Sequence, residues 1–235
     1  YLRVQLQMSR HDIVVIGYDD ERQLAYVVDN DRAEAQEVPL AALARARASQ
    51  AFPQPTRHCT YRITWPPSLP GIAEVAASAF SQSAGNMRNP SRHSIAGPTT
   101  AAVGSEGLEA VALFADDIAT WAELPEDELG IMLFSLGAFI EKAGTGGGLF
   151  RRLLADGCAE VARLTGDPAS AELATEAARC AQGWTDAARA AVKSDTHPRS
   201  RIDDLVRTAS RLPELELRLV ESLERAAISL NARDH

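Results

Sequence analysis

Apolar and polar positions follow two different patterns along the 235-residue chain. In the first 65 residues the apolar positions form short runs separated by turns that contain Gly, Asp or Pro, which is typical of β-strands. After Pro66-Pro67 they recur every three or four residues over long stretches, which is typical of amphipathic helices. The pattern therefore predicts an α+β protein, with a small antiparallel sheet in residues 1–65 and a mainly α-helical domain in residues 66–235.

The clearest strand pattern is a hairpin between His11 and Asp29. An apolar run at residues 13–16 is followed by a polar turn at 19–23 and by a second apolar run at 24–28. Two such runs around a turn predict a buried β-hairpin. His11 begins the first strand and Asp29 closes the second, so we expect both side chains at the same end of the hairpin.

The segment between this hairpin and the helical part is less regular. Residues 38–40 precede an Ala- and Arg-rich helix that is expected to end near Ser49, and Pro53 and Pro55 mark a linker. Residues 59–65 alternate as in one further strand. Cys59 is expected there to be a half-buried structural thiol rather than a nucleophile.

Beyond residue 66 the spacing predicts a series of helices with Pro- or Gly-containing connections. Asp167-Pro168 marks one helix start, because Asp is favoured at the N-cap and Pro at the first helical position. Pro213 either starts or kinks the last helix. Their apolar stripes are interpreted as core-facing seams. The expected helices are 72–83, 104–123, 126–142, 150–164, 168–191 and 202–230, the last with its continuation started or kinked at Pro213, with a loop at 82–100.

A Gly-rich segment, residues 144–148, lies between two of these helices. Such a loop exposes backbone N–H groups at the positive end of the following helix, where a carboxylate or phosphate binds well. The alternative is structural, because glycines also let two helices cross closely or turn sharply. The ligand-binding interpretation predicts substrate contacts for Thr145, Gly146, Gly147, Gly148 and Arg151.

Composition and charge narrow the classes of function. The net charge of −8 argues against a nucleic-acid-binding surface. No apolar run approaches the roughly 20 residues that a membrane span needs. Three widely separated cysteines suit a reducing cytosol better than a disulfide framework, and the lack of clustered His and Cys residues argues against a metal site.

His11 and Asp29 together resemble two members of a nucleophile–His–Asp triad, in which the carboxylate orients the imidazole and stabilises its cation. The string H-x-I-V-V-I-G-Y-D-D … A-Y-V-V-D resembles the second half of a papain-like cysteine peptidase or acyltransferase domain. It is most similar to the butirosin biosynthesis protein H family, and the string T-G-G-G-L-F-R-R at residues 145–152 is the second point of resemblance.

The resemblance implies an architecture and a chemistry. Residues 1–65 would be the C-terminal half of a cysteine-peptidase-like domain, finished by a strand and helix at 38–49, and residues 66–235 the helical domain. The nucleophilic Cys of the family lies well upstream of the His, so it is expected to precede Tyr1. His11 would be the general base and Asp29 its orienter.

The implied reaction moves an acyl group from the phosphopantetheine thioester of an acyl carrier protein to Cys, and then to an amine of a small molecule in specialised metabolism. No other cofactor is expected. Amide hydrolysis or peptidase activity by the same triad is the near alternative, and a non-catalytic binding module is the other. The expected partners are the carrier protein or a small-molecule substrate, in the cytoplasm, and homo-oligomerisation is left open.

Overall fold

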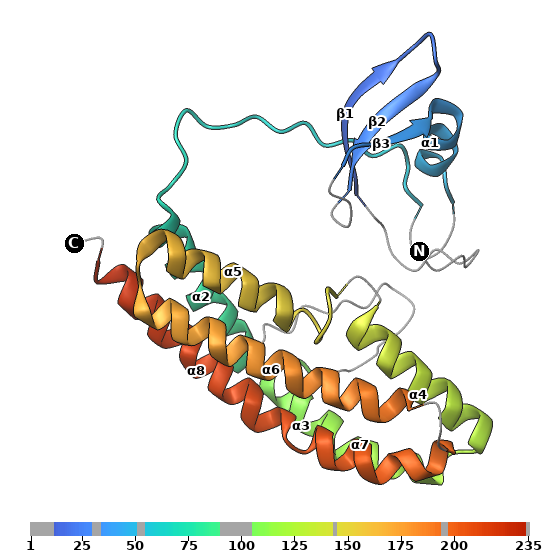
Figure 1. The fold of residues 1–235 in the computed structure, drawn as a ribbon, viewed down its shortest axis with the longest axis vertical. Helices are drawn as coiled ribbons and strands as arrows, with labels where there is room; N and C mark the ends of the chain where they lie inside the picture. Colours follow the sequence, from blue (N-terminus) through green and yellow to red (C-terminus); the bar gives the residue numbers. More distant parts are fainter. Residues whose placement is uncertain are drawn as a thin grey trace. The chain divides into compact units, whose positions relative to one another are not determined.

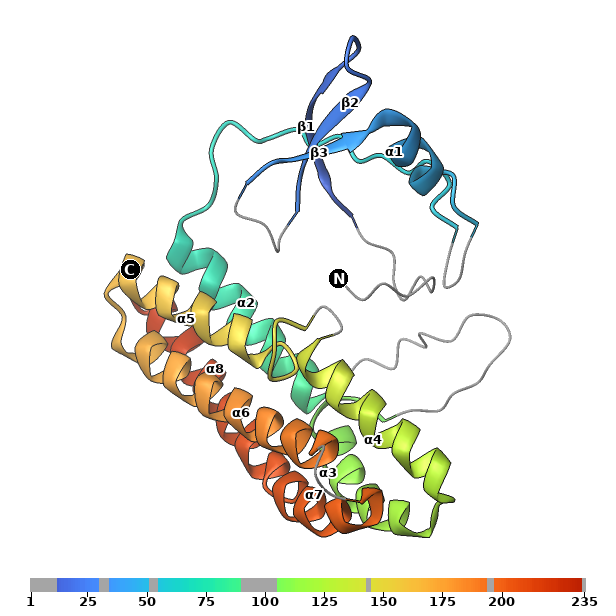
Figure 2. The ribbon, with the colours of Figure 1, turned by 45° about the vertical axis from the view of Figure 1, so that its right-hand side comes forward.

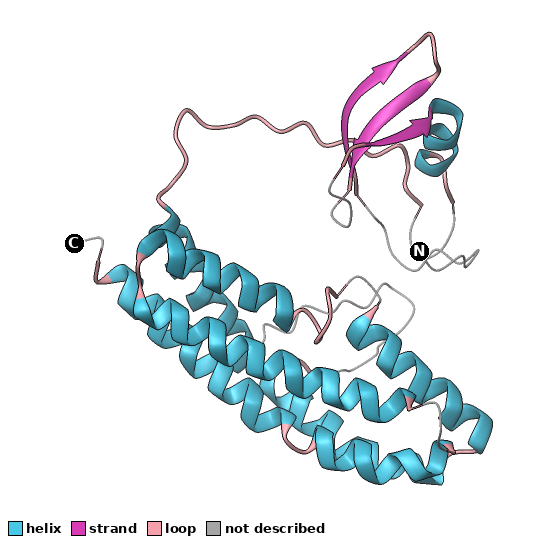
Figure 3. Cartoon of the chain, viewed as in Figure 1, coloured by secondary structure: helices cyan, strands magenta, loops and turns pink. Residues whose placement is uncertain are grey.

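The structure, a computed structural model, describes residues 12–29, 34–50, 55–89, 105–142, 145–193 and 197–233. The chain divides into two compact units, Tyr1–Ser68 and Leu69–His235. A small sheet with one helix forms the described part of the first unit, and the described elements of the second are all helical (Figures 1 and 3). The protein is therefore of the α+β class, as the pattern predicts.

The sheet of the first unit is antiparallel, with its three strands in the order β1-β2-β3. Val14 pairs with Val28 at one end of the predicted hairpin, and Asp19 pairs with Leu24 at the other. The predicted hairpin is thus confirmed. The elements of this unit are β1 (Val14–Asp19), β2 (Leu24–Val28), β3 (Gln36–Pro39) and α1 (Leu40–Arg47).

The two strands of the hairpin differ in burial. In the central strand, Ala25 and Val27 are buried, whereas Val14 and Ile16 in β1 are 62% and 58% exposed. A buried hairpin is therefore a wrong prediction for β1. The reason is topological, because β1 pairs only with β2 in the described sheet and stands at its edge.

Residues 59–65 form no strand, and the prediction of a further strand there is wrong. The segment is instead tied to α1 by side-chain hydrogen bonds, in which Arg47 donates to the His58 carbonyl at 3.1 Å and to the Thr60 hydroxyl at 2.8 Å. Cys59 is exposed, so its predicted half-burial is also wrong. An alternating pattern forms a strand only where a neighbouring strand supplies the ladder.

The second unit is built around two long helices, α6 and α8, which lie alongside each other (Figures 1 and 2). Helices α2 and α5 pack on one half of this pair, and α3, α4 and α7 pack on the other. The helices are α2 (Ile72–Arg88), α3 (Gly107–Asp117), α4 (Glu126–Glu141), α5 (Arg151–Thr165), α6 (Pro168–Val192), α7 (Ile202–Ala209) and α8 (Leu212–Asn231), with 3-10 turns at Ile118–Glu123 and Pro198–Arg201.

Most predicted helices are present, and the differences have local causes. Helix α2 continues to Arg88 instead of ending near Ser83, because Ala84 and Met87 of these last turns pack in or against the core. The Arg88 guanidinium also donates to Glu224 of α8 at 2.5 and 2.9 Å. The predicted helix 104–123 is α3 followed by a 3-10 turn, in which the Trp121 indole N–H donates to Asp117 at 2.9 Å. Of the loop predicted at 82–100, the part after Asn89 lies outside the described residues.

The apolar stripe predicted along α5 is only partly a core seam. Leu154 and Val161 pack against the core, but Phe150, Leu153 and Leu164 are each about half exposed. The core takes side chains from every described α-helix of this unit, and α6 and α8 contribute about half of it. The largest fully buried side chains of these two helices include Leu173, Leu212, Val220 and Leu230.

Asp167 connects the α5–α6 turn to the end of α8. Its buried carboxylate caps α6 by accepting the Ser170 N–H at 2.8 Å, and it accepts the hydroxyls of Ser170 at 2.7 Å and Ser229 at 2.6 Å. Arg233 forms an ion pair with it at 3.3 Å. Burial alone would raise the pKa of Asp167, but hydrogen bonds from Ser229, Ser170 and Arg233 outweigh it and hold this pKa below its ordinary value.

We predict that Asp167→Ala lowers the free energy of unfolding by about 2–4 kcal/mol, because it removes a helix cap and leaves buried donors without an acceptor. Urea unfolding followed by circular dichroism measures this change. Glu160→Ala, which removes a carboxylate that pairs with Arg163 at the surface, is the matched control and should change stability little. Equal effects of the two substitutions would contradict the role assigned to Asp167.

We also predict that Asp167 makes stability depend on acid pH. A carboxylate whose pKa is lowered by folding stabilises the protein above its unfolded pKa of about 3.9, and this contribution is lost as pH falls through the folded pKa. Between neutral pH and the acid range, the wild type should therefore lose more stability than Asp167→Asn. Parallel losses in the two proteins would show that Asp167 does not titrate in this way.

Candidate functional site

The predicted triad residues lie at the open end of the β1–β2 hairpin. Val28 is paired with Val14, so Asp29 lies one residue beyond the last pair of the ladder, at the end where β1 begins. Its side chain is half-buried and already has an interaction within the protein. His11 lies outside the described residues, and its approach to Asp29 stays a prediction.

The Gly-rich segment forms an unusual left-handed turn before α5. Five consecutive residues, Gly146 to Phe150, have positive φ, with values between 48° at Leu149 and 86° at Gly147. Leu149 and Phe150 carry side chains in this conformation, which costs roughly 1–2 kcal/mol for each. Gly148 is also required for space, because a Cβ there would lie 2.8 Å from the carbonyl oxygen of Ala181 in α6.

Hydrogen bonds within the protein hold this turn in place. The Thr145 hydroxyl donates to the Ile140 carbonyl at 2.7 Å, and the Leu149 N–H donates to the same carbonyl at 3.1 Å. Glu141 accepts the Gly148 N–H at 3.2 Å and the hydroxyl of Thr185 at 2.7 Å. These contacts connect the end of α4 to α6 and offset the strain of the turn.

The predicted ligand residues thus fall into two groups. The N–H groups of Gly148, Leu149, Phe150 and Arg151 all donate to oxygens of the protein. The predicted substrate contacts of Thr145, Gly146, Gly147 and Gly148 stay predictions. The side chain of Arg151, in contrast, points into the helical unit and meets a buried carboxylate. A ligand contact of Arg151 stays a prediction.

A buried charge pair lies between α5, α6 and α8. Glu216 is only 1% exposed. Its Oε1 lies 2.8 Å from the Nε of Arg151. The same oxygen accepts a hydrogen bond from the indole N–H of Trp184 at 2.6 Å. The Arg151 Nε–H lacks hydrogen-bond geometry, and Oε2 of Glu216 has no hydrogen-bond partner. Charge attraction therefore holds this pair more than directed hydrogen bonds do.

The charge pair lines a cavity of about 310 Å³ between α2, α5 and α8. The remaining wall is largely apolar, with Met87 from α2, Leu154 from α5 and Leu223 from α8. Ligand sites commonly combine an apolar wall with a few polar groups. This cavity is the candidate functional site of the helical unit.

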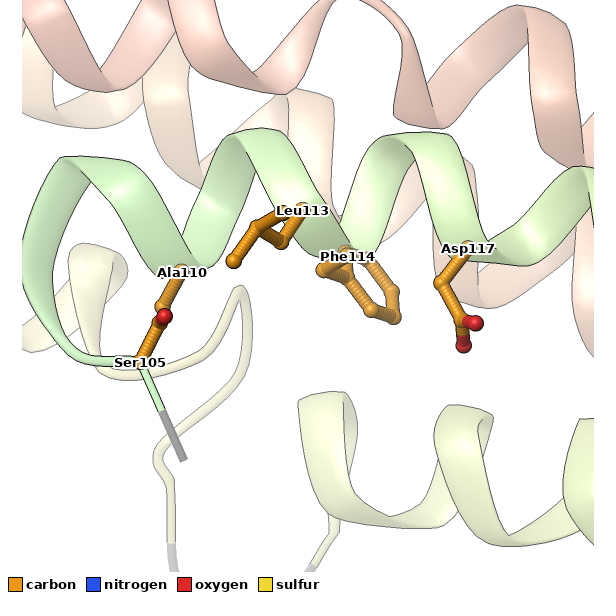
Figure 4. A pocket seen from close by; sticks show the side chains of 5 residues that line it. All are labelled: Ser105, Ala110, Leu113, Phe114 and Asp117. Carbon is orange, nitrogen blue, oxygen red and sulfur yellow. The ribbon is translucent and has the colours of Figure 1, made fainter. Parts of the chain in front are cut away.

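A second hollow, of about 400 Å³, lies along α3 and is lined by the five residues labelled in Figure 4. Leu113 is half exposed there, and the carboxylate of Asp117 already accepts hydrogen bonds from Trp121 and Thr120. It contains no buried polar atom without a partner among the described residues. The smaller cavity at Glu216 is therefore the better candidate, despite its volume.

The described cysteines differ in accessibility. Burial raises the pKa of Cys158 to about 12, and burial followed by the charge of Glu216 raises the pKa of Cys180 well above its ordinary value. Both thiols are buried and their raised pKa values disfavour the thiolate, which argues against either as a nucleophile. Cys59 is exposed in the segment that follows α1.

The described part of the chain has neither a membrane-spanning helix nor a cluster of metal ligands. No described helix has both the length and the apolar character of a membrane span. Within the same residues, no three His, Cys, Asp or Glu side chains lie close enough together to hold a metal ion.

Glu216 and Trp184 are the site residues that the sequence predictions missed. Glu216 lies on the core-facing stripe of α8, between Leu212 and Leu219. A carboxylate among core-facing apolar residues is the one feature of the sequence that could have marked it as a site residue. Its partner Arg151 follows a Gly-rich segment and was predicted only as an anion ligand. Spacing within one helix does not reveal a pair that joins residues 151 and 216.

The fold and the site define a small α+β protein with a ligand-sized cavity in its helical unit. Residues 41–223 match the model of a protein family that is described as a domain of unknown function, DUF4872, so the chain belongs to this family. The match begins in α1 and ends in α8. No curated protein and no solved structure matches the chain.

We predict that Gly148→Ala lowers the free energy of unfolding by about 2–4 kcal/mol, because it combines a disfavoured φ with a clash against the backbone of α6. Gly157→Ala is the matched control on the exposed face of α5, where an added Cβ meets nothing. It should stabilise the protein by about 0.5–1 kcal/mol. Chemical unfolding of both variants tests the prediction, and a neutral Gly148→Ala would contradict the left-handed turn.

Proposed function

We propose that this chain is part of a cysteine-dependent acyltransferase of specialised metabolism that acts in the cytoplasm. The observation that carries the proposal is the β1–β2 hairpin, which has Asp29 at the end where β1 begins. The resemblance to the butirosin biosynthesis protein H family supplies the chemistry. The nucleophile in this proposal is a Cys that precedes residue 1, as the resemblance implies.

The proposed reaction has two acyl transfers. The Cys thiol, deprotonated by His11, attacks the carbonyl of an acyl group on the phosphopantetheine thioester of a carrier protein, and the carrier thiol leaves with a proton. An amine of the small-molecule acceptor then attacks the acyl-enzyme, His11 takes its proton, and the Cys thiolate leaves. Asp29 orients the imidazole and stabilises its cation in both steps. Water in place of the amine gives the hydrolase alternative.

Intact-protein mass spectrometry tests the proposal on the full-length protein after incubation with an acyl-carrier thioester. We expect a covalent acyl adduct, and we expect His11→Ala to lower its rate of formation by at least about a hundredfold. Asp29→Ala should lower this rate by as much or less, through a misoriented imidazole. Asp20→Ala, in the turn of the same hairpin, is the control and should leave the rate unchanged.

The position of the adduct must also be determined, because Cys59 is an exposed free thiol on which an adduct could form without the triad. Peptide mapping and Cys59→Ser separate an adduct on Cys59 from one on an upstream Cys. No adduct in the full-length protein with several donors, or an adduct confined to Cys59, would contradict acyl transfer through the proposed triad and favour a binding module.

A further inference from the structure

The cavity at Glu216 has the size and lining of a small-molecule site. Its wall combines apolar side chains from three helices with Ser83 and Asn86 of α2 and the charge pair described above. An engineered cavity of about 150 Å³ with an apolar lining holds benzene, so one of about 310 Å³ has room for a two-ring molecule. The apolar lining consists of Met87, Phe150, Leu154, Leu219, Val220 and Leu223.

Glu216 gives this cavity an unused hydrogen-bond acceptor. The side chain is almost fully buried, and its Oε1 already serves both Arg151 and Trp184. Its Oε2 is buried without any partner. A buried acceptor left unsatisfied costs about 1–3 kcal/mol, and more when the group is charged, so a donor that reaches Oε2 gains this free energy on binding.

The charge of the pair decides what kind of donor fits. The guanidinium of Arg151 already balances the carboxylate, and its side chain is only 19% exposed. A cationic ligand would therefore bring an uncompensated positive charge into a mainly apolar cavity, which is strongly unfavourable. A hydroxyl or amide N–H satisfies Oε2 without adding charge.

We propose that the cavity between α2, α5 and α8 binds an uncharged, mainly apolar small molecule whose single hydroxyl or N–H group donates to Oε2 of Glu216. This site lies wholly within the helical unit, and it stands independently of the acyl-transfer proposal. Arg151 keeps the site neutral, and Trp184 fixes the orientation of the carboxylate through its indole N–H.

Calorimetric titration with three naphthalene probes tests this proposal on the 235-residue chain. The probes are 2-naphthol, which has a neutral donor, 2-methylnaphthalene, which has the same shape without a donor, and 2-(aminomethyl)naphthalene, which is a cation at neutral pH. We expect 2-naphthol to bind at least about tenfold more tightly than either of the others, the scale of one hydrogen bond to a charged group. Equal affinities, tightest binding of the cation, or no binding of any probe would overturn the proposal.

Variants locate the binding and identify the acceptor. Leu154→Trp fills the cavity and should abolish binding of 2-naphthol, whereas Leu164→Trp at an exposed position of the same helix should not change it. The neutral pair Arg151→Met with Glu216→Gln puts an amide in place of the carboxylate, and the preference for 2-naphthol over 2-methylnaphthalene should fall to about threefold or less.

Circular dichroism of each variant shows whether it folds, and the comparison of the three probes on the wild type does not depend on any variant. Binding of 2-naphthol that survives Leu154→Trp would place the site elsewhere. A preference that survives in the Arg151→Met, Glu216→Gln protein would remove Glu216 from the site. Either result contradicts the proposal.

Discussion

The helical unit depends on the neutralisation of one buried carboxylate. Glu216 is located in the core-facing stripe of α8, where an unpaired charge would be prohibitive. Arg151 from α5 supplies the counter-charge, and Trp184 from α6 supplies a hydrogen bond. The contacts of this carboxylate thus join α5, α6 and α8. The same indole stacks on Phe114 of α3, with ring centroids 5.7 Å apart.

The left-handed turn before α5 has a clear role in this arrangement. The turn lies between α4 and α5, which follow one another along α6, and it packs on α6 at Ala181. Helix α5 then begins with Arg151 directed at Glu216. The strain of Leu149 and Phe150 is tolerated because Thr145 and Glu141 hold both sides of the turn. The glycines are thus structural in their described contacts, and the charge that reaches the cavity belongs to the arginine that follows them.

The sequence predicted the elements whose boundaries depend on nearby residues alone. The Asp167-Pro168 helix start, the hairpin before Asp29 and the helix from Glu126 all follow from caps, turns and periodicity within a short window. The predictions failed where the structure of a segment depends on residues far away in the sequence. Residues 59–65 alternate but form no strand, and α2 continues to Arg88 because its last turns pack on the core formed by other helices.

The candidate site also combines features that depend on nearby residues with features that depend on distant ones. Arg151 was recognised from the motif around it, but its partner is 65 residues away in the chain, and no periodicity joins the two. The cavity itself exists only because α2, α5 and α8 leave space beside the charge pair. Sequence patterns specify which face of a helix is buried, but they do not specify how completely neighbouring helices fill the space between them.

The central claim is that Arg151 and Glu216 are coupled in the folded protein, and a double-mutant cycle measures this directly. Urea unfolding of Arg151→Met, Glu216→Gln and the double variant gives their coupling free energy, which should exceed about 2 kcal/mol because each single change leaves the other charge buried alone. The surface pair of Glu160 and Arg163 serves as the reference and should show far weaker coupling. A coupling at Arg151 and Glu216 no larger than that of the surface pair would contradict the account.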